Sequence, residues 1–441
     1  EINKTSKLID NYGKELAASL KELPKKVDAN RKKIKDSISA MRSEKLEPLM
    51  RELDRVAAEK AEAEEKLLQD TVRQFARDHL APKIEKLDIE EGFNREAFRT
   101  LGELGLLGIT VPEKDGGAGL GATAATIAFE EVAAVDASSA LSFLAHSILC
   151  VNQVALNANE EQKKKYLPKL ATGEWIGAWA LTEANTGSDA MRMKVTAKKV
   201  DGGWVLNGNK NWITHGATGD VVVAIVRTGE LLDSHGMTAF IIERGTKGLK
   251  AGKKENKLGM RASETAEVIF EDCFVSDGNV VGGESKIGAG FQQAMQILDG
   301  GRISIAALGL GIAKGAYEAS IKYAKERQQF GQPIANFQAI GFKLADMATK
   351  IEAGELLTMQ AAYLKNEHKK MTKESAFAKY YTSEIAVQIS TDAIQIFGGY
   401  GYTKDFPVEK FYRDSKLCTI GEGTSEIQKL VISREIMKGN I

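Results

Sequence analysis

The sequence predicts an α+β protein in which strands occupy the middle of the chain and helices lie before and after them. From about residue 64 to 174, and again from about 288 to the C-terminus, apolar residues recur three and four positions apart, as in amphipathic helices. Between these parts, residues 175–281 contain alternating β-rich runs separated by turn pairs such as Asn207-Gly208. This order differs from the βαβα alternation of a doubly wound sheet.

The first sixty residues form a part of their own, rich in charge and nearly free of aromatics. A heptad-like apolar stripe runs through them, at Leu20, Val27, Ile34 and Met41. Asn30 and Ser37 interrupt the complementary positions, so a helical hairpin, a short coiled coil and a solvated extension all remain open. The predicted division is therefore an extension (1–62), an N-terminal helical domain (63–175), a β domain (176–285) and a C-terminal helical domain (286–441).

Composition and charge exclude several function classes. Sixty Lys and Arg balance sixty Asp and Glu, which argues against nucleic-acid binding. The three cysteines are odd in number and far apart, and with five scattered histidines they predict neither a disulfide framework nor a metal site. No apolar run approaches the roughly 20 residues of a membrane span, and no signal peptide is expected. We expect a cytoplasmic protein, or a mitochondrial matrix protein in a eukaryote.

One glycine-rich motif imitates a dinucleotide-binding site. Gly117, Gly119 and Ala122 spell G-x-G-x-x-A after the sequence LGITV, which is expected to be a short extended piece. The residues PEKD separate the glycines from that piece, and the next helix leads into more helix and not into a second strand. A surface turn is the better interpretation, which weakens a nicotinamide-dependent function.

Four segments carry residues suited to chemistry. In LTEANTGSD (181–189), small hydroxyl side chains form a donor cluster suited to a phosphate or a ring edge. GNKNWITHG (208–216) places a Trp on a strand, where it either joins the core or flanks a flat cofactor. RQQFGQPIANFQAI (327–340) contains Arg327, which either clamps a phosphate or forms a surface ion pair.

The fourth segment, CTIGEGTSEIQ (418–428), is the most informative. Its Glu422 lies between two glycines, just before a helix expected to begin near Thr424. Because glycine permits unusual backbone angles and adds no bulk, a carboxylate there can enter a cavity. A lone glutamate is more often a solvated charge, so its neighbours decide the interpretation.

Taken in this order, the segments resemble the acyl-CoA dehydrogenase family, over roughly residues 64–441. LTEANTGSD resembles its first signature, and QIFGGYGYTKDFPVEKFYRD followed by IGEGTSEIQ resembles its C-terminal signature. The resemblance implies a helical–β-barrel–helical fold with a C-terminal four-helix bundle, FAD, a homotetramer and electron transfer flavoprotein as acceptor. It implies α,β-dehydrogenation of a saturated acyl-CoA, with Glu422 as the base.

The resemblance also assigns site residues. It implies FAD contacts at Trp179, Leu181, Thr182, Ser188, Trp212, Thr214, Arg327, Phe330, Gln338, Gln395, Gly399 and Thr424. It implies substrate contacts at Ser188, Arg302 and Gly423. The thioester oxygen would accept hydrogen bonds from the Glu422 N–H and a flavin ribityl hydroxyl. Some members carry the base at a position that is Gly301 here, so Glu422 is the candidate base.

Departures from the family pattern bear on substrate and activity. Gly421 replaces a common Tyr, which favours space for a branched or cyclic acyl group. Ala140 stands where glutaryl-specific members carry an Arg, which disfavours a dicarboxylic substrate, and an apolar pocket floor is expected around Leu141, Phe143 and Leu144. Two alternatives remain: an acyl-CoA oxidase, and a non-catalytic scaffold that binds acyl-CoA or FAD.

Overall fold

The computed structural model describes residue 35 and residues 47–439. The hairpin or coiled coil expected in 1–62 therefore lies largely outside the described residues. Helix α3 (Glu47–Phe75) continues through residue 62, and the chain divides into two compact units between Asp70 and Thr71. Within the first unit, α3 carries exposed ion pairs one turn apart, such as Lys66 with Asp70 at 3.0 Å. Each such pair stabilises a helix by about 0.2–0.5 kcal/mol.

The second unit begins with helices, as predicted. They are α4 (Ile84–Glu90), α5 (Arg95–Glu103), α6 (Gly121–Val135), α7 (Ala137–Leu144), the π-helical turn η6 (Ala145–Val151), α8 (Asn152–Asn157) and α9 (Glu160–Ala171). The extended piece expected in LGITV is wrong: Leu106–Gly108 is a 3-10 turn. The carbonyls of Gly108 and Ile109 accept from Ala118 and Leu120, so the glycine-rich turn folds back on this segment and no strand pairs with it.

A long apolar helix forms the centre of the N-terminal helical domain. Within the described part of the chain, Ala137–Asn157 (α7, η6 and α8) is one helix with the length and apolar composition of a membrane span. The expectation that the chain contains no such run is wrong. Ser, His and Asn interrupt the apolar residues of this helix, although its mean hydropathy reaches 1.5. Eighty-three per cent of the apolar window is buried inside the protein, which is how a core helix behaves.

The β domain is one seven-stranded sheet. Its strands are β1 (Gly177–Ala180), β2 (Thr196–Val200), β3 (Gly203–Thr214), β4 (Val221–Arg227), β5 (Met237–Glu243), β6 (Leu249–Lys254) and β7 (Thr265–Ser276). The order is β1-β4-β2-β3-β7-β6, with β5 paired to β4. Most pairs are antiparallel as expected, but β1 runs parallel to β4, and β2 meets β4 through one parallel bridge. Parallel pairing is possible because a long connection, which includes the loop of residues 181–195 and the β2–β3 hairpin, separates β1 from β4.

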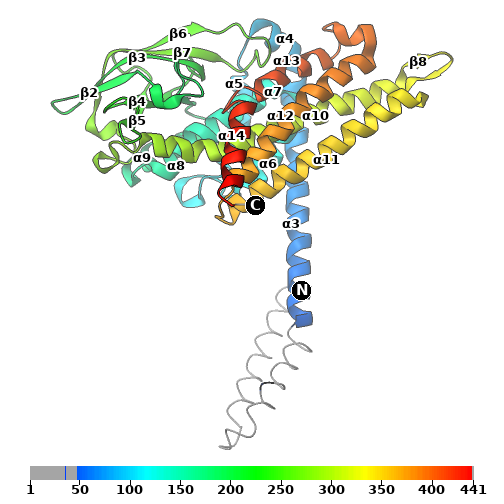
Figure 1. The fold of residues 1–441 in the computed structure, drawn as a ribbon, viewed down its shortest axis with the longest axis horizontal. Helices are drawn as coiled ribbons and strands as arrows, with labels where there is room; N and C mark the ends of the chain where they lie inside the picture. The colour runs from blue at the N-terminus through cyan, green and yellow to red at the C-terminus, as the bar shows by residue number, and fades with distance from the viewer. Residues whose placement is uncertain (1–34, 36–46, 440–441) are drawn as a thin grey trace, which may run out of the picture. The chain divides into compact units, whose positions relative to one another are not determined.

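The C-terminal part is helical, as predicted. It contains α10 (Gly290–Glu326), α11 (Gln338–Asn366), α12 (Thr372–Phe397), α13 (Val408–Cys418) and α14 (Ser425–Met437). The short hairpin of β8 (Gln328–Gln329) and β9 (Gln332–Pro333) joins α10 to α11. Figure 1 shows this hairpin at the end of the long helices that lies away from the sheet. The helical–β–helical fold is thereby confirmed.

Glycines let α10 lie against α6 without side chains between them. A Cβ added to Gly311 would lie 2.3 Å from the Glu130 carbonyl oxygen, and one added to Gly315 would lie 2.3 Å from that of Ala134. Glycine inside a helix costs roughly 1 kcal/mol relative to alanine, so it persists where the backbone of a neighbour must come this close. The result places α10 between the N-terminal helices and α12.

Two buried histidines under the sheet make stability depend on pH. The His146 Nδ1 accepts from the Gly177 N–H, and His215 lies against Phe93 and Phe98. Burial lowers the pKa of His146 to about 4 and that of His215 to about 3, from 6.5. Below pH 6.5 the unfolded chain binds protons that the folded protein refuses, so these residues destabilise the fold as the pH falls from 6.5 toward 4.

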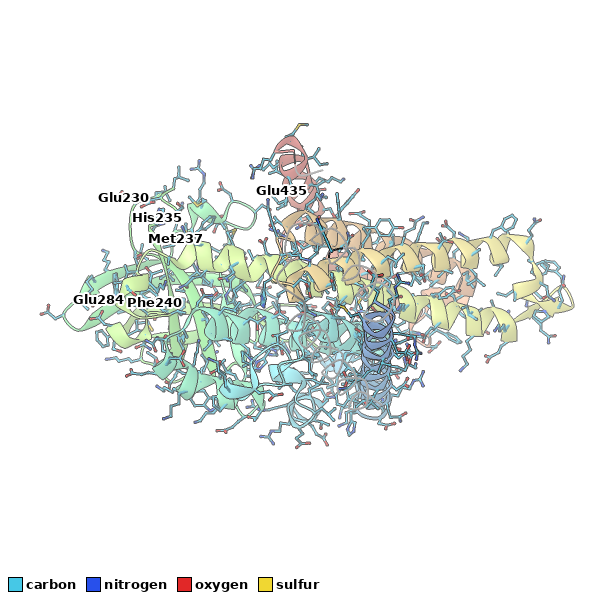
Figure 2. All side chains as sticks on the ribbon, turned by 90° about the horizontal axis from the view of Figure 1, so that it is seen from below. Glu230, His235, Met237, Phe240, Glu284 and Glu435 are labelled. Carbon is cyan, nitrogen blue, oxygen red and sulfur yellow. The ribbon has the colours of Figure 1, made fainter. Side chains whose placement is uncertain are left out.

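We expect His146→Gln to reduce this acid loss. The wild-type free energy of unfolding, measured by urea denaturation, should fall between about pH 7 and about pH 5. The loss should be up to about 1.4 kcal/mol per pH unit for each histidine, and the variant should lose less over that range. His235→Gln is the control, since Figure 2 shows His235 at the edge of the β domain and its side chain is 71% exposed. Equal pH dependence in all three proteins would contradict the assignment.

Candidate active site

Glu422 lies in the turn that joins α13 to α14, with its backbone in the left-handed region. Its φ is 51° and that of Gly423 is 92°. Thr424 caps α14 by accepting a hydrogen bond from the Ile427 N–H at 3.3 Å, which confirms the predicted helix start. Positive φ is costly for a residue with a side chain, and such strain gathers at functional sites. The turn therefore directs the Glu422 side chain toward α10 and not along a helix surface.

The Glu422 carboxylate lies directly over Gly301 of α10. A Cβ added to Gly301 would lie 1.9 Å from Oε2 of Glu422 and 3.4 Å from Cδ2 of Leu149. Oε2 is buried and has no hydrogen-bond partner in the described protein. Burial raises the pKa of Glu422 to about 7, while the charges of Lys379 and Arg302 act in the opposite direction. A carboxyl group that is half-ionised near neutral pH and lacks a partner is suited to exchange a proton with a ligand.

An apolar cluster adjoins this carboxylate, one to two turns beyond the predicted pocket floor. Leu149 and Ala145 of η6 pack with Ile297 of α10 and Trp179 of β1. Of the residues that we expected there, Phe143 and Leu144 are fully buried, with Phe143 packed on Phe129 at a ring-centroid distance of 4.5 Å, whereas Leu141 is as exposed as Leu149. The π-helical turn re-phases the helix after Leu144, a change that apolar periodicity does not reveal.

Arg302 lies next to Gly301 and is nearly buried. Its Nη1 donates to Oδ1 of Asp299 at 2.5 Å, so its charge is already paired within α10. Its positive charge favours the ionised form of Glu422. Arg302 and Gly423, which the resemblance assigns to the substrate, thus lie near the Glu422 carboxylate.

The first two sequence segments come together at the entry to the sheet. The Asn211 N–H donates to the Thr182 carbonyl at 2.9 Å. Lys210, fully buried on β3, donates through Nζ to the Leu181 carbonyl at 2.7 Å and to Oε1 of Glu183 at 2.9 Å. The sequence analysis did not single out this buried pair. A lysine inside a predicted strand, close to apolar residues, is nevertheless a signal that could have found it. The pair fixes the loop of residues 181–189 onto β3.

Replacing Lys210 by Met is expected to lower the free energy of unfolding by about 3–5 kcal/mol, because the Glu183 carboxylate would stay buried without its cation. Urea unfolding monitored by tryptophan fluorescence measures the change. Lys199→Met is the matched control: Lys199 pairs with Asp277, both side chains are about half exposed, and exposed pairs contribute about 0–1 kcal/mol. A loss no larger than that of the control would contradict the role of Lys210.

Trp212 leaves the sheet at an irregularity of β3. The register between β3 and β7 shifts between Lys210 and Ile213, and the Trp212 backbone has φ 63°. Such a bulge re-aims a side chain, and the Trp212 ring is 59% exposed and does not join the core. A large exposed indole on a rigid strand provides a flat surface for a planar ligand.

The loop of residues 181–189 has hydroxyl groups that are available to a ligand. The Thr186 hydroxyl is buried without a hydrogen-bond partner in the described protein, while Ser188 is exposed and Thr182 and Thr214 are partly exposed. Together with the exposed indole of Trp212, this gives an aromatic wall beside several hydroxyl donors. An aromatic face and free hydroxyl donors are the kinds of group that can hold the ring and the polar edge of an isoalloxazine.

The remaining predicted cofactor residues gather elsewhere, around the β8–β9 hairpin. The Arg327 guanidinium lies 5.4 Å from the Tyr400 ring centroid, and Phe397 at the end of α12 stacks on Tyr323 at 4.0 Å. Phe330, at the hairpin tip, is 92% exposed. Figure 1 shows this hairpin and the sheet at opposite ends of the second unit. Arg327 is partly exposed, and the other four residues of this group are exposed: Phe330, Gln338, Gln395 and Gly399.

Comparison with known proteins identifies the family of this chain. Three models of acyl-CoA dehydrogenase domains match the chain: the N-terminal domain over 62–174, the middle domain over 178–273 and the C-terminal domain over 288–437. The chain belongs to the acyl-CoA dehydrogenase family. This acyl-CoA dehydrogenase is an FAD-dependent oxidoreductase, which confirms the resemblance and the cofactor inferred from the sequence.

Relatives of this acyl-CoA dehydrogenase cover its second unit almost completely. It is 44% identical to the acyl-CoA dehydrogenase of Bacillus subtilis (strain 168), over 85% of this chain and 98% of the relative. It superposes on the butyryl-CoA dehydrogenase of Megasphaera elsdenii with a TM-score of 0.82 and 40% identity, over 85% and 98% of the two chains. It also superposes, with a TM-score of 0.83 and 43% identity, on a chain from a structural study of the electron transferring flavoprotein of Acidaminococcus fermentans and of flavin-based electron bifurcation. The match covers 85% of this chain and 98% of that chain.

Proposed function

We propose that Glu422 is the base that removes the α-proton of a saturated acyl-CoA thioester. One observation carries the proposal: the carboxylate is buried without a partner beside the apolar cluster of Leu149, Ala145 and Ile297. Burial raises the pKa of Glu422 to about 7, so a useful fraction is ionised at neutral pH and the proton that it accepts is not held too weakly. Exclusion of water by the acyl chain raises the basicity of the carboxylate further.

The backbone of the same turn is suited to stabilise the anion that forms. Within the described chain, the Glu422 N–H donates to no protein acceptor. A thioester oxygen placed there accepts this hydrogen bond, which strengthens as negative charge develops on the oxygen during proton removal. One residue thus supplies both the base and an oxyanion donor.

FAD is held, in this proposal, by two groups of residues from different subunits. Trp179, Leu181, Thr182, Ser188, Trp212, Thr214 and Thr424 form the group beside the substrate. Arg327, Phe330, Gln338, Gln395 and Gly399 form the other. When bound, FAD accepts the hydride that leaves the β-carbon. Because the hairpin carrying Phe330 lies at the other end of the unit and is almost fully exposed, we infer that it serves the cofactor of a second copy in a homotetramer.

The substrate class follows from the surroundings of Glu422. The side chains packed around Leu149 are apolar and suit a hydrocarbon chain, so we propose a monocarboxylic acyl group. Gly421 leaves open the space beside the base, and its added Cβ would meet nothing nearer than 3.5 Å. A short straight or branched chain fits both features, and the likeness to butyryl-CoA dehydrogenase agrees with it. We propose electron transfer flavoprotein as the electron acceptor. We also propose that the enzyme is cytoplasmic.

Anaerobic titration with butyryl-CoA, isovaleryl-CoA, octanoyl-CoA and glutaryl-CoA tests the proposal. The first two should bleach the flavin most completely, and glutaryl-CoA least. Reoxidation of the reduced enzyme by electron transfer flavoprotein should be much faster than by oxygen; the opposite order would identify an acyl-CoA oxidase. Retention of FAD without bleaching by any of the four thioesters would overturn the proposed substrate class, and a protein that retains no flavin and binds thioesters only would support the scaffold.

A further inference from the structure

Lys379 is a buried cation behind the catalytic turn, and sequence reasoning did not single it out. It lies on α12 and has no exposed surface. Its Nζ donates to the Gly423 carbonyl at 2.6 Å. Among the described residues, no carboxylate lies within ion-pair distance of this Nζ, whereas Arg302 on the other side of Glu422 is already paired with Asp299. A buried ammonium without a counter-ion is costly, so its position calls for an explanation.

Three residues of α12 contact the catalytic turn. Besides Lys379, Ser383 donates through Oγ to the Cys418 carbonyl at 2.8 Å, and Glu384 accepts from Oγ of Ser425 at 2.6 Å. Lys379 and Ser383 lie one turn apart on the same face of α12, and Glu384 follows about 100° further round the helix, so α12 contacts both ends and the centre of the turn. Lys379 holds the centre, at the peptide that immediately follows the base.

A neutral donor already binds the same carbonyl. Nε2 of Gln428 donates to the Gly423 carbonyl at 3.0 Å. Holding the turn therefore does not by itself require a charge at position 379. What Lys379 adds is a positive charge in a region of low dielectric constant, where it acts on the Glu422 carboxylate with little screening. Burial lowers the pKa of Lys379 to about 8, so the side chain is cationic at neutral pH and loses its charge only toward pH 9.

Two cations near Glu422, Lys379 and Lys365, have no carboxylate within ion-pair distance among the described residues, and of the two only Lys379 donates to the catalytic turn. The Cys418 thiol is neutral, since burial raises its pKa to about 12. Glu384 is engaged with Ser425. The groups that face this region are Arg302 and Asp299 from α10, Lys365 from α11 (beside Gly300), Lys379 and Glu384 from α12, and Cys418 from α13.

We propose that Lys379 is a positioning residue for proton abstraction: its ammonium group, anchored on the Gly423 carbonyl, orients the turn and keeps the buried Glu422 carboxylate anionic and ready to accept the α-proton. The inference rests on the proposed role of Glu422 as the base. It assigns α12 a part in the reaction, although none of its residues needs to touch the substrate.

The test separates the charge of Lys379 from its hydrogen bond. Lys379→Gln removes the charge and keeps a donor, and Lys379→Arg keeps the charge. Gln428→Met removes the neutral donor to the same carbonyl, together with its longer contact to the Glu422 carbonyl at 3.5 Å. For each holoenzyme, the second-order rate constant of anaerobic flavin bleaching by butyryl-CoA is measured from about pH 5.5 to about pH 9. This quantity reports the free-enzyme pKa of the base.

Lys379→Gln should raise the apparent pKa of the rate by about one unit above the wild-type value, so that the rate near pH 6 falls about tenfold while the high-pH plateau stays within about twofold. Lys379→Arg should retain the wild-type profile, and Gln428→Met should lower the rate by a similar factor at every pH. An unchanged apparent pKa in Lys379→Gln would overturn the inference, whatever the size of the rate loss.

A second measurement does not depend on turnover. Infrared titration of the oxidised holoenzyme follows the band of protonated carboxyl groups, and its loss in Glu422→Gln assigns the contribution of Glu422. Lys379→Gln should move this titration to higher pH. If Glu422→Gln still bleaches rapidly, the proposed function fails and the role of Lys379 fails with it. If Glu422→Gln is inactive but Lys379→Gln titrates like the wild type, only the role of Lys379 fails.

Discussion

Glu422→Gln is expected to bind FAD and acyl-CoA but to leave the flavin oxidised. The amide has nearly the shape of the carboxylate and cannot accept the α-proton, so flavin bleaching should slow by about 10²–10⁴-fold, the range that general-base catalysis contributes. The fold should be unaffected, because Oε2 makes no hydrogen bond within the described protein. Stopped-flow absorbance under anaerobic conditions measures the rate, and the flavin spectrum measures cofactor content.

Glu426→Gln is the matched control for this substitution. Glu426 lies four residues further on in the first turn of α14, and its side chain is exposed. The control should bleach at the wild-type rate. A rate for Glu422→Gln within about tenfold of the wild type would show that another group removes the proton, since a missing general base costs at least about 10².

Gly301→Ala is expected to cost nearly as much as loss of the base, although it leaves the base in the sequence. The new Cβ would lie 1.9 Å from Oε2 of Glu422, far inside van der Waals contact, so the carboxylate must move. A displacement of about 1 Å at a reacting group can lower the rate about 10²-fold. FAD content should stay at the wild-type level, because Gly301 lies on α10 away from the loop of residues 181–189 and from the β8–β9 hairpin.

Gly341→Ala makes the same chemical change where there is room for it. Gly341 also lies in a helix, and a Cβ added to it would have no neighbour within 4 Å. Its stability should be unchanged or slightly higher, because alanine favours helices by about 1 kcal/mol. Equal flavin bleaching by Gly301→Ala and Gly341→Ala would contradict the position of the Glu422 carboxylate over α10.

The order of helices, sheet and helices, and the inward-directed Glu422 that we propose as the base, could be predicted from local signals in the sequence. The glycines around Glu422 mark a turn that can direct a carboxylate inward, and the alternating runs of residues 175–281 mark a sheet. What the sequence could not reveal depends on contacts between distant segments. The parallel pairing of β1 with β4 and the approach of Gly301 to Glu422 arise only when the chain is folded.

Two misjudged details have a common physical cause. Leu149 was not expected near Gly301, because a π-helical turn shifts the phase of the helix and a period of 3.6 residues carries no sign of that shift. Lys379 resembles any other lysine on an amphipathic helix. Its burial comes from the turn of residues 418–425 packing over it, which local periodicity cannot show.

The apolar helix Ala137–Asn157 has a consequence for how the protein is made. Its covering partners include α10, which begins only at Gly290, so a ribosome exposes this helix long before the segment that shields it has been synthesised. During that interval the nascent chain displays a segment that chaperones or the membrane-insertion machinery can capture. Successful biogenesis then depends on the relative speed of translation and capture, and chains truncated before α10 should accumulate as aggregates or at membranes.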